Sequence, residues 1–209
     1  MAFRRLALAV LAAATLSGCA ADEQRIEPEI RNAGLRFSTA VPEGDQQWIL
    51  AAIAKARPEA QQLINDIDGM VVITLFNDRN TNVFGLTKGT APGAYEVSFN
   101  IAWLNTDRKI DRDTTVLHEL GHVIDHRLVP PPLRNELAAA LPPSGGCATP
   151  EMGDCTAAEE RFADTFAKWA LRGAVSAAGV GYGVVAPASL EDWGAPLSTL
   201  AIEIDVASR

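Results

Sequence analysis

All three histidines of this 209-residue chain lie in one short segment, TTVLHELGHVIDHRLVP, at positions 118, 122 and 126. The apolar residues of the segment recur with the spacing of a single helix, which we expect to run to about Leu128 and to end before Pro130. Residues four apart lie on the same face of a helix, so His118 and His122 present their imidazoles toward one point. The fold must therefore place a partner for two histidines opposite this helix.

The segment HELGH, from His118 to His122, has the HExxH pattern of zinc hydrolases. In such sites two histidines bind Zn²⁺, and the glutamate, here Glu119, accepts a proton from the water that the metal activates. Uncharged residues flank the motif, as a helix buried beneath a cleft requires. The alternative is a buried helix whose histidines only make hydrogen bonds within the core. His126 cannot bind the same ion, because about 12 Å of helix rise separates it from His118.

A third metal ligand has to come from elsewhere in the chain, since no histidine remains. The metzincin spacing requires a glycine at position 125 and a histidine at position 128, where this chain has Asp125 and Leu128. That class of peptidase is therefore excluded. A carboxylate is expected instead, as in the His₂Glu type of catalytic zinc site, which leaves a fourth position for water.

A second helix is predicted in TAAEERFADTFAKWALRG, from Thr156 to Gly173. Its first residues have the pattern of a capping box, in which the side chains of Thr156 and Glu159 bind exposed amides of the first turn. Glu159 is then occupied, and Glu160 is free to bind a metal. The alternative is that the acidic residues of this helix are solvated on the protein surface, where glutamate is common.

Small residues favour a close approach of the two helices. Glu160 and Asp164 are four apart on one face of the second helix, and Ala163 and Ala167 flank them on that face. Gly121 lies on the histidine-bearing face of the first helix, at a cost of about 1 kcal/mol relative to alanine. A close contact between the helices could offset this cost and bring a carboxylate to the histidines.

The motifs HELGHVID and ERFAD, the second from Glu160 to Asp164, resemble those of gluzincin-type zinc peptidases related to the catalytic domain of anthrax lethal factor and to the Pro-Pro endopeptidases. In that family HExGHxxD is followed several tens of residues later by ExFAE, so Asp164 replaces the second glutamate. The resemblance implies that His118, His122 and Glu160 bind zinc. It also implies that Glu119 is the general base and that Asp164 orients a ligand histidine.

One departure from that family concerns the transition state. The family's tyrosine, seven residues before the ligand glutamate, falls on Gly153. The chain has two tyrosines, Tyr95 and Tyr182, and Tyr182 lies in a Gly-Tyr-Gly segment after the second helix. From there Tyr182 can swing toward the site as a substitute oxyanion donor. The alternative is a half-buried tyrosine that only packs.

The N-terminal segment MAFRRLALAVLAAATLSGCA has a basic start, an apolar run and then small residues, which is the build of a secretory signal peptide. The motif LSGC, ending at Cys19, resembles a bacterial lipobox, in which the cysteine becomes the lipidated first residue. The alternative is an ordinary signal peptide cut near Ala20 or Ala21. The lipobox interpretation predicts a protein anchored to a membrane through its lipid and otherwise soluble.

Three segments follow from this pattern: a lipoprotein signal peptide at 1–18, a polar tether at 19–40 and a zinc metallopeptidase domain at 41–209. The formal net charge is −8, and loss of the signal peptide removes two arginines and no acid. Such an acidic protein is a poor candidate for binding nucleic acid. Cys147 and Cys155 flank a loop, and in an exported protein we expect them to form a disulfide. A thiolate metal site is the alternative.

The remaining pattern predicts an α+β fold. MVVITLF and AYEVSFNIAWL indicate strands, whereas DQQWILAAIAKA and PEAQQLINDID have helical spacing. No element is predicted between Asn77 and Gly93, and no more than a short helix is predicted at the C-terminus. Asp111 and Asp113 are possible caps of the histidine helix. We expect a small mixed or antiparallel sheet packed on the HExxH helix and on the second, ligand-bearing helix.

Together these features predict an exported, lipid-anchored zinc peptidase of the cell envelope. Water activated at the metal attacks the peptide bond, Glu119 acts as general base, and a peptide or protein is the substrate. Two alternatives stay open. One is a binding or structural lipoprotein that keeps the zinc site as a brace without catalysis, and the other is zinc-dependent hydrolysis of a non-peptide amide.

Overall fold

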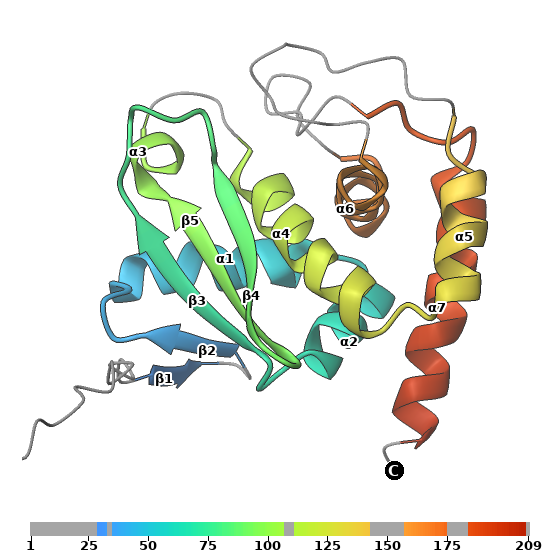
Figure 1. The fold of residues 1–209 in the computed structure, drawn as a ribbon, viewed down its shortest axis with the longest axis horizontal. Helices are drawn as coiled ribbons and strands as arrows, with labels where there is room; N and C mark the ends of the chain where they lie inside the picture. Colours follow the sequence, from blue (N-terminus) through green and yellow to red (C-terminus); the bar gives the residue numbers. More distant parts are fainter. Residues whose placement is uncertain (1–28, 33–34, 107–110, 143–156, 175–183, 208–209) are drawn as a thin grey trace, which may run out of the picture.

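The computed structural model describes residues 29–32, 35–106, 111–142, 157–174 and 184–207. These residues form an α+β fold with one mixed sheet, as the sequence predicts. Figure 1 shows the sheet on one side of the molecule, with helix α4 (Arg112–Arg127) beside it and helix α6 (Ala158–Ala170) beyond α4. The histidine helix is therefore the middle layer of the fold.

The five strands of the sheet follow the order β1-β2-β3-β5-β4. They are β1 (Glu29–Asn32), β2 (Leu35–Ser38), β3 (Val71–Phe76), β4 (Gly85–Ala91) and β5 (Ala94–Asn100). The central strands β2, β3 and β5 are parallel, and the two outer strands are antiparallel to their neighbours. Among the described strands, β4 pairs with β5 alone and is one edge of the sheet.

Alternation along β3 and β5 separates a core face from a polar face. Ile73 lies opposite Val97, and both, like Phe99, are inaccessible to solvent. On the other face Thr74 lies opposite Ser98, and their hydroxyl oxygens are 2.7 Å apart in a hydrogen bond. The period of two residues along a strand produces this division, so the apolar face is free to pack on helices.

The predicted tether is wrong for its last part, because β1 and β2 lie within residues 19–40 and join the sheet. In β2, Leu35 and Phe37 are buried in the core. The strand is only four residues long, so its alternation is too short to stand out from a polar, charged sequence.

Strand β4 occupies part of the polar stretch in which no element is predicted. Its sequence, GLTKGTA, is poor in β-branched and aromatic residues, so its strand propensity is low. Hydrogen bonding to β5 stabilises the strand instead. The predicted strand AYEVSFNIAWL also ends earlier than expected. Asn100 terminates β5 and caps helix α3 (Ile101–Leu104) by accepting a hydrogen bond from the amide of Ala102.

The helices before and after the sheet agree with the pattern in most respects. Helices α1 (Glu43–Lys55) and α2 (Pro58–Asp66) lie where helical spacing predicts them, and Pro58 occupies the first turn of α2. Helix α4 begins after Asp111, whose carboxylate accepts a hydrogen bond from the Thr114 amide at 3.1 Å. Asp111 is thus confirmed as the cap.

Helix α5 (Pro131–Ala139) was not predicted from the sequence, and helix α7 (Leu190–Ala207) is longer than predicted. The prolines after α4 both end that helix and start α5, because proline is tolerated in a first turn. Helix α7 has 18 residues and buries Trp193, Leu197 and Ala201 along one face. None of the helices in the described part of the chain is long and apolar enough to cross a membrane.

Helix α4 is surrounded by protein on nearly every side. Residues of every face of its central turns are buried, and Leu117, Leu120 and Ile124 are inaccessible to solvent. Complete burial of each such side chain stabilises the fold by about 1.5–3 kcal/mol. A helix that is buried all round can carry buried polar groups only where neighbouring elements supply partners. The buried histidines and acids of α4 therefore indicate where such partners, and a functional site, are found.

Helix α7 packs on α6 through an unusually close contact. An added Cβ on Gly194 would lie 1.9 Å from Nε1 of Trp169, a side chain that is inaccessible to solvent. The guanidinium of Arg57 lies 4.7 Å from the centroid of the Trp169 ring and pairs with Glu191 of α7 at 2.7 Å. Gly194 therefore determines how closely α7 approaches the helix that carries Glu160.

We expect Gly194→Ala to lower the free energy of unfolding by about 1–3 kcal/mol or more, because the new methyl group overlaps the Trp169 ring. Urea denaturation followed by Trp fluorescence measures the change. Gly44→Ala in α1 is the matched control, since nothing lies within 4 Å of its added Cβ. Equal stability of Gly194→Ala and the control would contradict the packing that we describe.

Candidate metal centre

Helix α4 brings the two motif histidines together on a buried face. His118 is 3% and His122 is 8% exposed, and their Nε2 atoms are 3.2 Å apart. The rings are nearly perpendicular, with centroids 4.8 Å apart. The spacing of four residues therefore directs both nitrogens to one point, as the sequence predicts.

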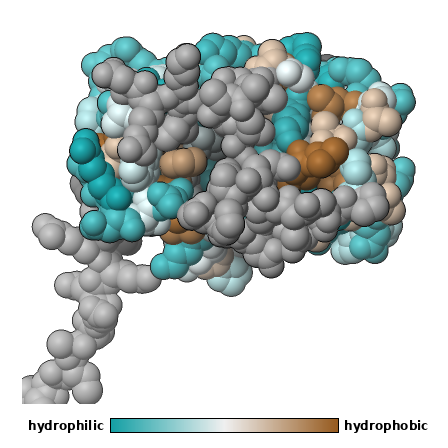
Figure 2. Space-filling view, turned by 90° about the horizontal axis from the view of Figure 1, so that it is seen from above, coloured by the Kyte–Doolittle hydropathy of each residue, from teal (hydrophilic) through white to brown (hydrophobic). Residues whose placement is uncertain are grey.

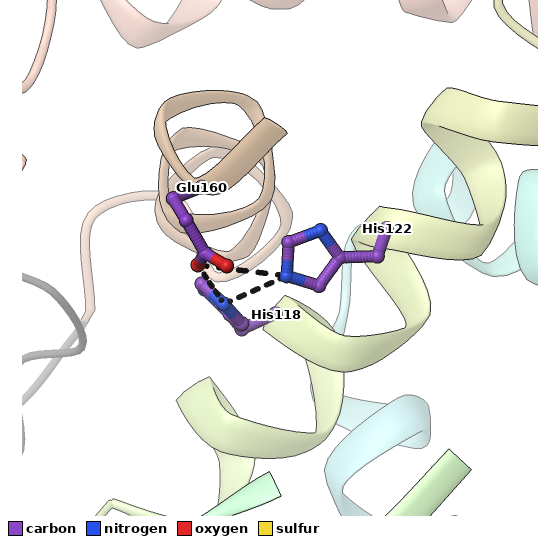
Figure 3. A group of neighbouring side chains, drawn as sticks. All are labelled: His118, His122 and Glu160. Atoms are coloured by element: carbon purple, nitrogen blue, oxygen red, sulfur yellow. Dashed lines mark hydrogen bonds and ion pairs between the residues drawn. The ribbon is translucent and has the colours of Figure 1, made fainter. Parts of the chain in front are cut away.

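Glu160 reaches the same point from α6 (Figure 3). Its Oε2 atom is 3.1 Å from Nε2 of His118 and 3.6 Å from Nε2 of His122. The side chain of Glu160 is 22% exposed, so the group opens to solvent on the side of this carboxylate. In the described part of the chain, these three residues form the group that could hold a metal ion, and we call them the triad.

The geometry of the triad fits a small divalent metal. A tetrahedral ion with bonds of about 2.0–2.1 Å places its ligand atoms about 3.3–3.4 Å apart. The three separations of the triad, 3.1, 3.2 and 3.6 Å, lie around this value. The donor set is also appropriate, because two imidazoles and one carboxylate are common ligands of such ions.

Close packing of α4 and α6 makes this geometry possible. An added Cβ on Gly121 would lie 3.2 Å from Cα of Ala163 and 3.1 Å from Cδ1 of Phe166. Gly121 is three residues after His118, and Ala163 is three residues after Glu160. The predicted role of the small residues is thus confirmed, since the two backbones approach each other one turn from the ligands.

The triad has an electrostatic asymmetry that matters for metal binding. Burial opposes the charge of Glu160, but hydrogen bonds to His118 and His122 outweigh it and lower the pKa of Glu160 to about 2. Burial also disfavours the charged form of His122, yet the hydrogen bond to Glu160 and the charge of Glu119 raise its pKa above 6.5. Glu160 is therefore ionised at neutral pH, and protons compete with a metal at His122.

Glu119 is 3% exposed and is held by strand β4. The hydroxyl of Thr87 lies 2.8 Å from its Oε2 atom and 3.0 Å from its backbone oxygen. An added Cβ on Gly85 would lie 2.5 Å from Cγ of Glu119, so glycine leaves room for this side chain. Sequence reasoning missed Thr87 and Gly85, because no strand pattern placed this segment beside α4.

A cavity of about 290 Å³ opens at the triad, and we call it the main cavity. It is lined by Thr87, Gly89, Tyr95, His122, His126, Glu159 and Glu160. The ring of Tyr95 stacks on that of His126, with centroids 6.5 Å apart and an interplanar angle of 8°. His126 does not join the triad, as its spacing predicts, but it forms part of the wall.

Asp164 lies one turn after Glu160 and is inaccessible to solvent. Its Oδ2 atom accepts a hydrogen bond from Nζ of Lys168 at 2.5 Å, and Lys168 also donates to the carbonyl of Val184. The Oδ1 atom of Asp164 is buried and has no hydrogen-bond partner among the described residues. Its predicted role of orienting a ligand histidine stays a prediction. The spacing of four residues signals the pair with Lys168, which was not predicted.

The predicted N-cap is wrong, and Thr156, one of the two residues of the predicted capping box, lies outside the described residues. Helix α6 begins at Ala158, its N-cap is Ala157, and no side chain makes a capping hydrogen bond. Glu159 is exposed and lines the main cavity instead. With Ala157 as N-cap, Glu159 is the second residue of the helix and not the third, which is the position that a capping box requires. Glu160 is nevertheless the residue of this helix whose carboxylate meets the histidines.

Several predicted features lie outside the described residues. They are Tyr182, the disulfide of Cys147 with Cys155, the glycine at position 153 and the lipidation of Cys19. Each stays a prediction. Membrane fractionation of the wild type and of Cys19→Ser checks the lipid anchor, and a thiol count of the exported protein checks the disulfide.

The comparisons with known proteins add no relative. No family model, curated protein or solved structure matches this chain. The conclusions about the site therefore rest on the geometry of this chain.

We expect Glu160→Ala to lose the bound metal and Glu159→Ala to keep it. Both changes remove one carboxylate from neighbouring positions of α6, but only Glu160 contacts the histidines. The two variants are thus matched for charge and helix position. Elemental analysis after loading with zinc and gel filtration measures about one ion per chain in the wild type. Full retention in Glu160→Ala would show that the third ligand is a different residue.

We expect zinc affinity to fall by at least about 10-fold between pH 8 and pH 5.5. Metal binding requires neutral histidines, and the pKa of His122 is raised above 6.5, so protonation competes throughout the lower part of this range. The pKa of Glu160 is about 2, and this residue contributes nothing to the change. Titration against a competing chelator at both pH values measures the affinity. A constant affinity would refute the histidine ligands.

Proposed function

We propose that this protein is a zinc-dependent peptidase with Glu119 as its general base. The observation that carries the proposal is the convergence of two imidazoles and one carboxylate at a cavity, next to a glutamate that Thr87 holds in place. Catalytic zinc sites have three protein ligands and an open position, whereas structural sites are usually closed by four. Within the described ranges the triad has three members and opens on the main cavity, which favours catalysis over a structural brace.

Zinc bound by the triad would polarise the scissile carbonyl and make water acidic enough to attack at neutral pH. Glu119 accepts a proton from this water as the water oxygen bonds to the carbonyl carbon. Glu119 then donates the proton to the amide nitrogen as the C–N bond breaks. One peptide leaves with a new carboxyl group and the other with a new amino group. The hydrogen bond from Thr87 keeps the carboxylate in one orientation through both transfers.

The edge strand supports a peptide as substrate. Strand β4 pairs with β5 on one side only, and most of its residues are exposed. An extended peptide can add to such an edge through backbone hydrogen bonds. Thr87 and Gly89 of this strand line the main cavity, so a peptide paired there would pass beside the triad. A small non-peptide amide would make no use of this edge.

We assign to the hydroxyl of Tyr95 the role of donating a hydrogen bond to the oxyanion of the transition state. Tyr95 lines the main cavity together with His122 and Glu160, and His126 stacks on its ring. A donor placed where negative charge develops lowers the barrier without affecting the fold. Tyr182, predicted for this role, lies outside the described residues, so the two tyrosines are alternatives that mutation separates.

We expect Glu119→Gln to retain zinc and to hydrolyse peptides at least about 10²-fold more slowly. Glutamine has the size of glutamate and can still accept the hydrogen bond from Thr87, but it cannot take up a proton from water. Cleavage of a broad peptide library and elemental analysis measure the two properties. Equal activity of the variant and the wild type would refute the mechanism. No cleavage by a zinc-loaded wild type would favour a binding lipoprotein with a zinc brace.

We expect Tyr95→Phe to lower kcat by about 10-fold or more, with little effect on KM or on unfolding. Tyr182→Phe is the matched control and should have wild-type kinetics. The opposite result would assign the oxyanion to Tyr182. Full activity of both variants would leave the metal and backbone amides as the groups that stabilise the charge.

A further inference from the structure

A second cavity, of about 150 Å³, lies next to the main cavity. It is lined by residues of α4, α5 and α6 and by Leu141, and we call it the side cavity. His126 of α4 and Glu159 of α6 line both cavities. The two cavities therefore share a boundary at these two residues.

The walls of the side cavity are mainly apolar. They consist of Leu137, Ala138, Leu141, Ala158 and Phe162. Leu137, Leu141 and Phe162 are themselves packed into the hydrophobic core, so these walls are fixed by the fold. Seen from above, the most hydrophobic part of the visible surface also lies on the half of the molecule that contains α6 and α7 (Figure 2).

At one end of the side cavity Arg134 and Asp125 are already paired with each other, and the exposed carboxylate of Glu159 lies at the boundary with the main cavity. Nε of Arg134 lies 2.6 Å from Oδ1 of Asp125, and Arg134 also donates to the backbone oxygens of Asp125 and Val129. These contacts compensate the guanidinium and the buried carboxylate within the protein. An anionic ligand group would have to displace one of these contacts and would be repelled by Glu159, whereas an uncharged apolar group can pack on the apolar walls without disturbing them.

The size of the side cavity selects among apolar groups. An apolar cavity of about 150 Å³ is large enough to hold benzene. A leucine, methionine or phenylalanine side chain matches this volume, and a tryptophan exceeds it. Burial of such a side chain strengthens binding by about 10- to 100-fold relative to glycine.

We propose that the side cavity is a specificity subsite, which takes a leucine-sized to phenylalanine-sized side chain of the substrate residue next to the scissile bond. This inference rests on the proposed peptidase function, because it assigns the occupant from the boundary that the side cavity shares with the cavity at the triad. A peptide held at the triad has a neighbouring side chain within reach of the boundary at His126 and Glu159. The protein is thus a peptidase that selects an apolar residue beside the cut.

The test measures binding and needs no turnover. Two dipeptide hydroxamates, identical except for a leucine or a glycine side chain beside the hydroxamate, are titrated calorimetrically into the full-length, zinc-loaded protein. We expect the leucine compound to bind about 10- to 100-fold more tightly. An aspartate compound should bind no better than the glycine compound, since the charge of Arg134 is already paired.

Ala138→Phe fills the side cavity from α5, away from the triad. We expect this change to reduce the preference for leucine to less than about threefold, with the affinity for the glycine compound retained. Ala139→Phe is the matched control, because Ala139 is exposed on the same helix and does not line the cavity. Ala138→Leu, a smaller change, should give an intermediate preference and covers a failure of Ala138→Phe to fold.

Three results would overturn the subsite: no preference for leucine in the wild type, an unchanged preference in both Ala138 variants, or no binding of either hydroxamate by zinc-loaded protein. Failure of the peptidase function has a different signature. In that case the wild type cleaves no peptide, while the leucine preference and its loss in Ala138→Phe persist.

Discussion

The contact between α4 and α6 at Gly121 is the constraint on which the geometry of the triad depends. The two helices carry members of the triad that are far apart in the sequence, and an added Cβ on Gly121 would lie 3.2 Å from Cα of Ala163. Metal sites tolerate deviations of only about 0.2 Å in each bond. A small increase in helix separation would therefore remove Glu160 from the histidines while leaving most of the core in place. Glycine at this position sacrifices helix propensity, and the close approach explains why.

Buried charges near the centre are each held by a partner from the surrounding structure. Glu119 of α4 is bound by Thr87 of β4, and Asp125 of the same helix by Arg134 of α5. An unpaired buried charge costs several kcal/mol, and pairing offsets the cost without adding much stability. These partners consequently serve orientation more than folding. They connect the sheet and α5 to the one helix that bears the motif.

Regular spacing along a helix made part of the centre predictable. His118 and His122 follow from a period of four residues, and Glu160 follows from the small residues on its face and from the resemblance of its motif. Thr87 and Tyr95 could not be found in this way, because they reach the site through the register of β4 against β5, and β4 has no strand pattern. The start of α6 at Ala158 was also mispredicted, since a capping motif can match by chance and the helix boundary depends on packing.

Among the described strands β4 is an edge, and its Thr87 binds Glu119, so on the proposed mechanism substrate alignment and base orientation share one element. On that mechanism, the register of a peptide paired with β4 fixes which of its peptide bonds lies beside Glu119. A shift of one residue would turn each of its side chains to the opposite face, and a shift of two would move the chain by about 6.8 Å. Backbone pairing with β4 would then set the position of the cleaved bond. The side chains of the peptide would determine only which peptides bind.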